Sequence, residues 1–257
     1  VLAGFAAGLF MRGLRRLCDH LPDRMAGIKP TLIYPIAGLL FIGVFMCLVD
    51  PFVGGFSARL SQMLDSMSGI SRMALGAVLG GMMAVDMGGP VNKVAYVAAT
   101  GAVATAVASG LPLNSAAYQM MAAVMAGGMV PPLILALCAT CFPWLFTQQE
   151  RRIAPINYLL GLCFITEGAV PFAAADPLRV IPSCILGGSL AGALSMFWGC
   201  TLPAPHGGVF VFPLAGNAAG YALALLLGTL AGALCLALLR RFWVPRGMRR
   251  THTGNPQ

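Results

Sequence analysis

The chain has 257 residues, of which 58% are hydrophobic and 9% are charged, and its formal net charge is +8. An ordinary soluble domain is about 45–50% apolar and about 25% charged, so these charges are too few to cover a water-soluble globular enzyme. Disorder is excluded as well, because disordered chains are rich in charge and poor in apolar residues. The composition is that of a polytopic membrane protein, for which we expect an all-α fold, and at ~20 residues per spanning helix the chain has room for roughly eight membrane segments plus loops.

Most of the basic residues lie in short clusters between apolar runs, at residues 12–29, at Arg151 and Arg152, and at residues 240–250. Nucleic-acid binding would need a basic groove with interleaved aromatic side chains, which the sequence lacks. Arginine clusters between apolar segments are instead typical of cytoplasmic loops. We therefore expect all three clusters on the cytoplasmic side, with residues 240–257 as a cytoplasmic tail.

The first apolar runs differ in length. Residues 1–11 are too short to cross a bilayer, so we interpret them as the end of a segment whose beginning precedes Val1. Residues 30–49 are long enough to span. Residues 51–72 place their apolar side chains at roughly helical spacing, which predicts an amphipathic interfacial helix. A polar loop that contains a short helix fits these residues equally well.

Further apolar runs follow at about 73–85, 94–111, 119–142, 180–202 and 218–239. Pairs of adjacent glycines within the runs predict close packing of helix on helix through small residues, and hinges for alternating access are the other interpretation. These pairs are Gly80–Gly81, Gly127–Gly128 and Gly187–Gly188.

The charge clusters constrain the number of crossings. If residues 12–29 are cytoplasmic, the next four runs return the chain to the cytoplasm at the second arginine cluster. Three apolar runs then remain before the arginine-rich tail, and three crossings would leave that tail outside. Residues 156–172 are short, contain a glutamate and are broken by a glycine and a proline. We therefore predict a re-entrant hairpin at 156–172, buried in protein or lining a cavity.

Few ionisable side chains lie within the apolar parts of the chain. A charge inside the bilayer costs about 2.5–3.5 kcal/mol even on lenient insertion scales, so each such group is expected to face a cavity or a partner. These groups are Asp86, Lys93, Glu167, Asp176 and His206.

The stretch DMGGPVNK at residues 86–93 interrupts a helix with two glycines and a proline. The break frees backbone N–H and C=O groups next to polar side chains, which predicts a bend that binds a hydroxylated ligand. An Asp86–Lys93 ion pair that closes the bend is the structural alternative, and the two interpretations are compatible. The predicted ligand-binding residues of the bend are Asp86, Gly89, Pro90, Asn92 and Lys93.

Glu167 lies in the stretch FITEGAVPFAAADP. A carboxylate accepts two or more hydrogen bonds, which suits the paired hydroxyls of a sugar. Such a group can also serve as a general base when a hydroxyl attacks a phosphoryl group. Capping of a re-entrant turn is the structural alternative.

Two further ionisable residues have weaker signals. His206 lies in the loop PAPHGG, where its ring can bind a sugar hydroxyl or contact an incoming phosphate, and a purely structural histidine fits equally well. Asp176 precedes Pro177 and Arg179, which favours a turn former or a surface ion pair.

The eight cysteines show no spacing typical of a metal site, and most lie in apolar segments. We interpret them as small buried side chains and expect neither disulfides nor a metal. The sequence has no Walker loop, dinucleotide fingerprint or nucleophile triad, so no cofactor is expected.

Three motifs resemble the membrane IIC component, or permease, of bacterial fructose-type sugar phosphotransferase systems (PTS). They are AVDMGGPVNKVAY at 84–96, ITEGAVPFAAADPLRVIPS at 165–183 and PHGGVFVF at 205–212. The first two are long and quite specific, whereas the third is weaker alone, and the resemblance covers nearly the whole chain in order. Family members have additional membrane segments before this point, so residues 1–257 are expected to be the C-terminal portion of a IIC domain.

This resemblance implies a homodimeric, all-helical transporter of the glucose-type superfamily, with re-entrant hairpins, in the bacterial cytoplasmic (inner) membrane. It implies that the Ile-Thr-Glu stretch supplies the sugar-binding glutamate, here Glu167, with Thr166 beside it. A phosphocysteine on a partner IIB domain phosphorylates the sugar as it enters, and the phosphate comes from phosphoenolpyruvate through a IIA domain. The chain is thus expected to act as an enzyme only within this multi-component phosphotransferase, since the phosphate donor residue is not in it.

The predicted function is translocation of fructose or a fructose-like sugar, coupled to its phosphorylation. Glu167 is the predicted main ligand and assists deprotonation. One alternative is an ion-coupled secondary transporter or facilitator, in which Glu167 relays protons or binds an ion. Another is a PTS permease for 2-O-mannosyl-glycerate. A requirement for phosphorylated IIB separates the phosphotransferase from the secondary transporter.

Overall fold

The computed structural model describes residues 2–19, 28–45, 47–48 and 69–242. These residues are predominantly helical, and the β structure among them is one isolated bridge, between Thr201 and Gly216. The chain divides into two compact units, residues 1–56 and residues 57–257. The interfacial helix predicted at 51–72 lies outside the described residues, except that residues 69–72 begin a longer helix. Of the predicted tail at 240–257, only its first three residues are described.

The first unit contains helix α1 (Leu2–Cys18), the short π-helix η2 (Lys29–Ile33) and the helix Tyr34–Phe45. The ring of Phe10 stacks on that of Phe41 with their centroids 4.0 Å apart, so α1 packs along the helix Tyr34–Phe45. The last turn of α1 carries basic side chains, where they favourably meet the negative end of the helix dipole.

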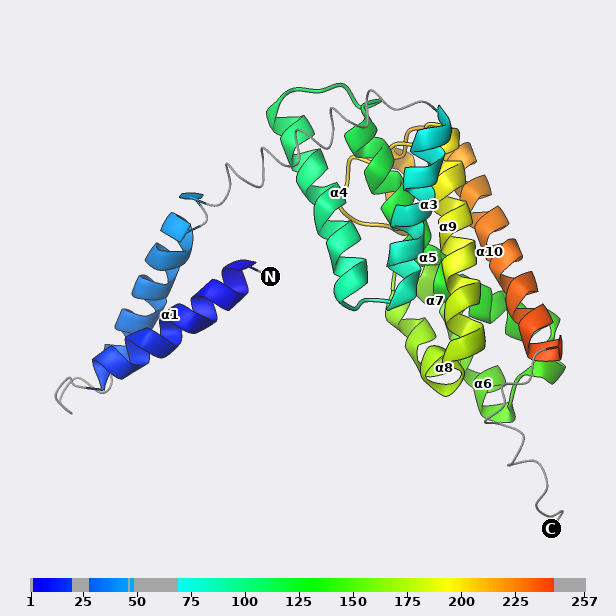
Figure 1. The fold of residues 1–257 in the computed structure, drawn as a ribbon, viewed down its shortest axis with the longest axis horizontal. Coiled ribbons are helices and arrows are strands. Elements are labelled where there is room, and N and C mark those ends of the chain that lie inside the picture. The colour runs from blue at the N-terminus through cyan, green and yellow to red at the C-terminus, as the bar shows by residue number, and fades with distance from the viewer. Residues whose placement is uncertain (1, 20–27, 46, 49–68, 243–257) are drawn as a thin grey trace, which may run out of the picture. The chain divides into compact units, whose positions relative to one another are not determined.

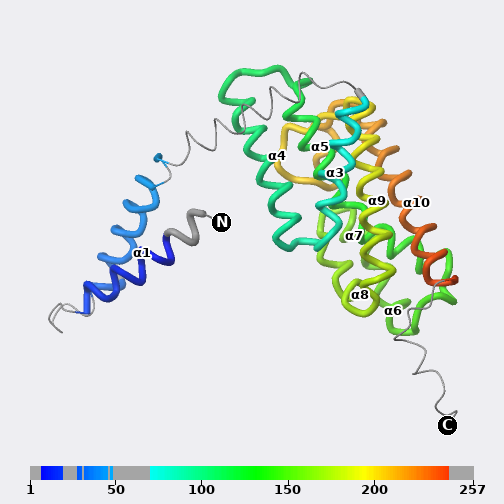
Figure 2. Tube along the Cα trace, in the orientation of Figure 1, coloured from blue at the N-terminus to red at the C-terminus, as the bar shows by residue number. Residues whose placement is uncertain are grey.

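Five apolar helices run side by side in the second unit (Figures 1 and 2). Four of them, α4, α5, α9 and α10, are long and apolar enough to cross a membrane, and α3 is a shorter apolar helix. This bundle confirms the predicted polytopic helical architecture. Their bounds are α3 (Gly69–Val85), α4 (Pro90–Ala108), α5 (Ala116–Cys141), α9 (Pro177–Phe197) and α10 (Ala218–Phe242).

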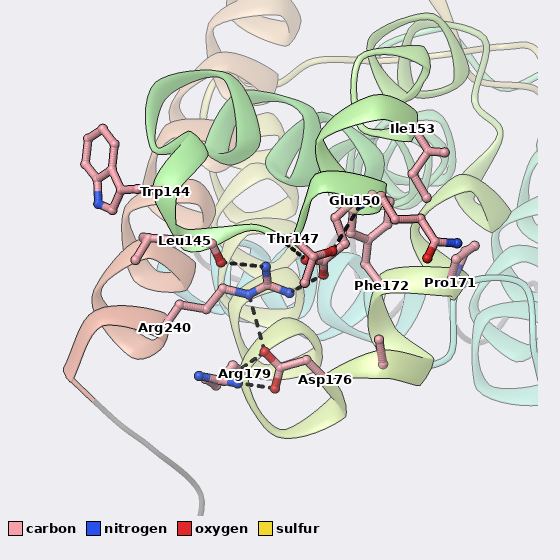
Figure 3. A pocket seen from close by; sticks show the side chains of 12 residues that line it. Trp144, Leu145, Thr147, Glu150, Ile153, Pro171, Phe172, Asp176, Arg179 and Arg240 are labelled. Atoms are coloured by element: carbon pink, nitrogen blue, oxygen red, sulfur yellow. Dashed lines mark hydrogen bonds and ion pairs between the residues drawn. The ribbon is translucent and has the colours of Figure 1, made fainter. Parts of the chain in front are cut away.

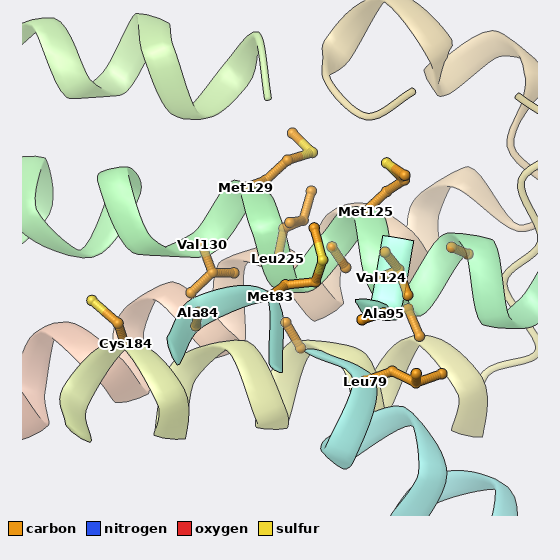
Figure 4. Close-up of a cluster of buried hydrophobic side chains, with 14 of the residues drawn as sticks. Leu79, Met83, Ala84, Ala95, Val124, Met125, Met129, Val130, Cys184 and Leu225 are labelled. Carbon is orange, nitrogen blue, oxygen red and sulfur yellow. The ribbon is translucent and has the colours of Figure 1, made fainter. Parts of the chain in front are cut away.

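Helix α5 is the central helix of the bundle, because most of its side chains are buried. Figure 4 shows its methionines Met125 and Met129 in one buried apolar cluster with Met83 of α3 and Leu225 of α10. The opposite side of α10 exposes leucines such as Leu230. An exposed apolar face of this kind would be unfavourable in water and fits contact with lipid.

Glycines allow the helices to approach each other closely, as the glycine pairs predict. A Cβ atom at Gly188 of α9 would lie 2.7 Å from the carbonyl oxygen of Gly80 in α3. A Cβ at Gly187 would lie 2.7 Å from the carbonyl oxygen of Gly228 in α10. No side chain fits between backbones at such distances, so the packing interpretation of these glycines is confirmed.

Two segments between the long helices are irregular. Residues 156–172, predicted not to span, form α7 (Ile156–Leu162), the 3₁₀ turn η4 (Thr166–Ala169) and the start of α8 (Val170–Ala175). A second irregular segment, residues 199–217, contains the 3₁₀-helix η5 (Val209–Leu214) and dips between α4 and α5 (Figure 1). Before α7, a 3₁₀ turn η3 (Pro143–Leu145) and the short α6 (Gln148–Ile153) follow α5.

Candidate functional site

The break between α3 and α4 is held by a carboxylate. Asp86 Oδ2 accepts a hydrogen bond from the backbone N–H of Val91 at 2.7 Å, and Oδ1 accepts one from the N–H of Asn92 at 2.9 Å. These N–H groups belong to the first turn of α4, where helices leave backbone donors unpaired. Asp86 therefore caps α4 and also meets the positive end of the helix dipole.

The other predicted residues of this bend have distinct positions. Asn92 is 7% exposed, and its Nδ2 donates to the carbonyl oxygen of Met83 at 2.8 Å, which ties α4 to the end of α3. Lys93 is exposed and forms no ion pair with Asp86, so the predicted Asp86–Lys93 ion pair is wrong. Gly89 lies against the Asp86 carboxylate, and Pro90 occupies the first position of α4.

Glu167 lies on the turn η4 and its carboxylate reaches the break between α3 and α4. A Cβ atom at Gly88 would lie 3.1 Å from Glu167 Oε1, so the backbone of the break and the carboxylate are close neighbours. The Glu167 side chain is exposed, whereas Thr166 beside it is buried. The structure thus brings the first and second motifs together, with the glutamate accessible to a ligand.

The third motif, the loop at 205–212, also lies beside α4 and the turn that precedes Glu167. The hydroxyl of Tyr96, on α4, donates to the carbonyl oxygen of Pro205 at 2.7 Å. The ring of His206 lies 5.8 Å from that of Phe164, centroid to centroid, and His206 is exposed. Phe164 in turn packs against Gly207, where a Cβ would collide with its ring. These contacts link the 205–212 loop to α4 and to the turn that precedes Glu167.

Strained backbone lies on both sides of the site. Met87 and Phe164 have positive φ angles of 47° and 63°, a conformation that is uncommon for bulky residues. Each lies directly beside the segment that carries a predicted site residue, Asp86 or Glu167. Strain of this kind persists where the surrounding structure over-determines it, and it clusters at ligand sites.

The geometry favours binding of a polar, hydroxylated molecule. Glu167 offers acceptor oxygens, and the exposed side chains of Lys93 and His206 offer donors. Within the described parts of the chain, no group of three or more histidine, cysteine, aspartate or glutamate side chains could hold a metal ion.

A separate cavity of about 570 Å³ lies beside α6, α8 and the end of α10 (Figure 3). None of the site residues above lines it. Arg240 lies at its edge, 5% exposed, with Nη2 2.9 Å from Glu150 Oε1 and Nε 3.3 Å from Asp176 Oδ2. Its Nη1 donates to the carbonyl oxygen of Leu145 at 3.2 Å, and its guanidinium stacks over the ring of Phe146.

Sequence reasoning identified only part of this ion cluster. Asp176 pairs with Arg179 at 2.8 Å, as predicted, but Asp176 is buried and the Arg179 side chain is only 14% exposed. The contacts of Arg240 with Glu150 and Asp176 were missed, because their partners lie far away in the chain. A buried amide on α7, Asn157, was also missed, since an asparagine within an apolar run has no distinctive spacing.

Comparison with known proteins shows which family and which relatives the chain resembles. Residues 1–187 match the family described as "Phosphotransferase system, EIIC". The chain is 41% identical over 248 residues to the "PTS system fructose-specific EIIABC component" of Bacillus subtilis, a match that covers 93% of this chain and 38% of that relative. It is 40% identical to the "Fructose permease IIC component" of Bacillus amyloliquefaciens, with 93% and 78% covered.

A third relative, the "PTS system fructose-specific EIIB'BC component" of Escherichia coli, is 44% identical over 225 residues, which are 86% of this chain and 38% of that protein. The chain therefore spans well under half the length of the first and third relatives. No solved structure matches.

Proposed function

Because the chain belongs to the EIIC family of the phosphotransferase system, we propose that it translocates a sugar across the membrane while that sugar is phosphorylated. The observation that carries the proposal is the approach of the exposed Glu167 carboxylate to the broken backbone at Gly88. This juxtaposition offers an anionic acceptor next to an irregular backbone, in a bundle whose long helices can span a membrane. Irregular backbone at membrane depth is tolerated where it lines a cavity or is buried in protein.

The proposed substrate is fructose or a close analogue. Three relatives carry fructose in their names, and the resemblance of the three motifs to fructose-type permeases agrees with this. In this proposal Glu167 accepts hydrogen bonds from sugar hydroxyls, and Lys93 and His206 donate to the sugar. Thr166, Gly89 and Pro90 line the site.

Asp86 and Asn92 stabilise the bend. The Asp86 carboxylate accepts hydrogen bonds from backbone N–H groups of α4, and the Asn92 amide donates one to the backbone carbonyl of Met83. This role differs from the direct contact that the sequence suggests for them.

The proposed chemistry is positioning and proton removal. The sugar hydroxyl oxygen attacks the phosphorus of a phosphorylated partner domain, and the bond between the phosphorus and the donor residue breaks. The hydroxyl proton passes to Glu167, which acts as general base.

The chain holds the hydroxyl in line with the phosphoryl group, and IIB and IIA domains, fused or separate, supply the phosphate. The relatives named EIIABC and EIIB'BC support such partners. A homodimer in the bacterial cytoplasmic membrane completes the proposal.

The test uses the full-length parent protein in membrane vesicles with phosphoenolpyruvate, the general phosphotransferase proteins and the matching IIA and IIB domains. Labelled fructose should become fructose phosphate, and Glu167→Gln should reduce the rate at least about 100-fold, the lower range for loss of a general base. Asp19→Asn, the same change at an exposed carboxylate of the first unit, is the matched control and should keep full activity. Fructose uptake that follows a proton gradient and ignores phosphorylated IIB would contradict the proposal.

A further inference from the structure

A buried amide lies directly behind the turn that carries Glu167. Asn157, in the first turn of α7, is 1% exposed, and neither its Nδ2 nor its Oδ1 has a hydrogen-bond partner among the described residues. Its Oδ1 packs against the backbone of Gly168, because a Cβ added at Gly168 would collide with that oxygen. The amide therefore faces η4 at the residue after Glu167.

An unpaired amide in this place is costly. Most buried polar groups of native proteins are paired, and a buried amide without a partner pays the penalty of its lost hydration. The surroundings are apolar, since the side chain of Leu160 also lies against Gly168, and that of Leu133 lies against Gly161 on the same helix. A leucine would occupy the Asn157 position without that penalty, so the packing around this position gives no reason for an asparagine.

We propose that Asn157 is a positioning residue for Glu167. When sugar occupies the site, the Asn157 amide hydrogen-bonds the backbone of η4 and holds the Glu167 carboxylate against the sugar hydroxyls. An amide has two donor hydrogens and two acceptor lone pairs, so it can pair with an N–H or a C=O group that the turn presents. Part of the binding free energy of the sugar then comes from the hydrogen bonds that the Asn157 amide makes with the turn. This inference rests on the proposed sugar site.

A second buried amide provides a matched control. Asn92 is 7% exposed, and its Nδ2 is already paired with the carbonyl oxygen of Met83. Both side chains are asparagines near the start of a helix beside the site, but one is paired and the other is not. Replacement of each by leucine therefore should shift the stability of the empty protein in opposite directions.

The experiment measures two quantities on the purified full-length protein in nanodiscs, the unfolding temperature without sugar and the dissociation constant for fructose. Asn157→Leu should unfold at the wild-type temperature or above it, and should bind fructose about tenfold more weakly, which corresponds to about 1.4 kcal/mol. Asn92→Leu should unfold at a lower temperature. Asn157→Ala, which adds no volume, tests the same loss of affinity if the leucine variant does not fold.

Two results would overturn the inference. Wild-type fructose affinity in both Asn157 variants would show that the amide has no part in binding. An unfolding temperature that falls as far as in Asn92→Leu would show a structural role instead. Glu167→Gln separates this inference from the proposed function: if that variant loses fructose binding while the Asn157 variants keep it, only the role of Asn157 is wrong. Absence of fructose binding in the wild type would overturn both.

Discussion

Gly88 provides both a backbone conformation and a space beside Glu167 that a residue with a Cβ atom would not. Its φ of +110° lies in the region that glycine adopts readily, and a Cβ there would approach Glu167 Oε1 to 3.1 Å. The conformation concerns the backbone of the break, and the space concerns the position of the carboxylate. Their coincidence at one residue makes Gly88 the link between the first two motifs.

We therefore expect Gly88→Ala to affect stability and sugar binding together. The strained backbone should cost about 1–3 kcal/mol of unfolding free energy, and the displaced carboxylate should weaken fructose binding about tenfold or more. Equilibrium unfolding and direct binding to the purified protein measure the two effects. Gly110→Ala is the matched control, because Gly110 has a φ of +63° but no atom within 4 Å of the added Cβ. That variant should lose similar stability and keep its affinity, and equal affinity losses in both would contradict the prediction.

At the scale of elements, the start of α4 depends on Asp86. A helix that begins directly after a break has no preceding turn to satisfy its first N–H groups. The two Asp86 oxygens bond the N–H groups of Val91 and Asn92, and Pro90 has no N–H to satisfy. The carboxylate therefore fixes the position at which the spanning helix begins.

We expect Asp86→Ala to destabilise the protein by about 0.5–2 kcal/mol, as loss of a helix cap does. Asp86→Asn retains one acceptor oxygen, so it should lose less stability and keep its fructose affinity within about twofold, since an amide caps a helix nearly as well. Thermal unfolding and fructose binding by both variants test this. A large loss of affinity in Asp86→Asn at unchanged stability would instead show that Asp86 binds the sugar directly.

The long helices could be predicted from the sequence because continuous apolar runs specify them locally. The run at 119–142 corresponds to α5 (Ala116–Cys141) and the run at 218–239 to α10 (Ala218–Phe242). The convergence of the three motifs needed the family resemblance, since hydropathy says nothing about which breaks meet in space. The cap formed by Asp86 and the unpaired amide of Asn157 were not predictable, because both depend on which backbone groups face the side chain.

On the scale of the whole second unit, an ion pair tests the predicted topology. Glu150 follows α5 and Arg240 ends α10, and the two side chains meet at 2.9 Å (Figure 3). Glu150 precedes the cluster of Arg151 and Arg152, and Arg240 begins the cluster at 240–250. Both arginine clusters therefore lie at one end of the bundle, which agrees with the expectation that they face the same side of the membrane. Two long helices, α9 and α10, separate the clusters in the chain, which agrees with two crossings and a hairpin that does not span.

The same ion pair should make stability depend on pH in the acid range. Burial acts to raise the pKa of Glu150. The hydrogen bond from the Thr147 backbone N–H and the hydrogen bond and positive charge of Arg240 together lower the pKa by more, so it lies below its usual value of 4.5. The folded protein therefore holds this carboxylate ionised more strongly than the unfolded chain does. Its contribution to stability is complete above about pH 4.5 and is lost as the pH falls through the lowered pKa.

Glu150→Gln removes the titrating group and should flatten the stability profile below about pH 4.5, while it lowers stability at neutral pH because Arg240 loses a buried partner. Unfolding free energies measured from pH 3 to pH 7 for both proteins, at constant ionic strength, give this comparison. Other carboxylates titrate in both proteins, so the difference between the two profiles isolates Glu150. If that difference is constant across the range, the ion pair does not hold the end of α10 against α6, and this end of the bundle is stabilised by packing alone.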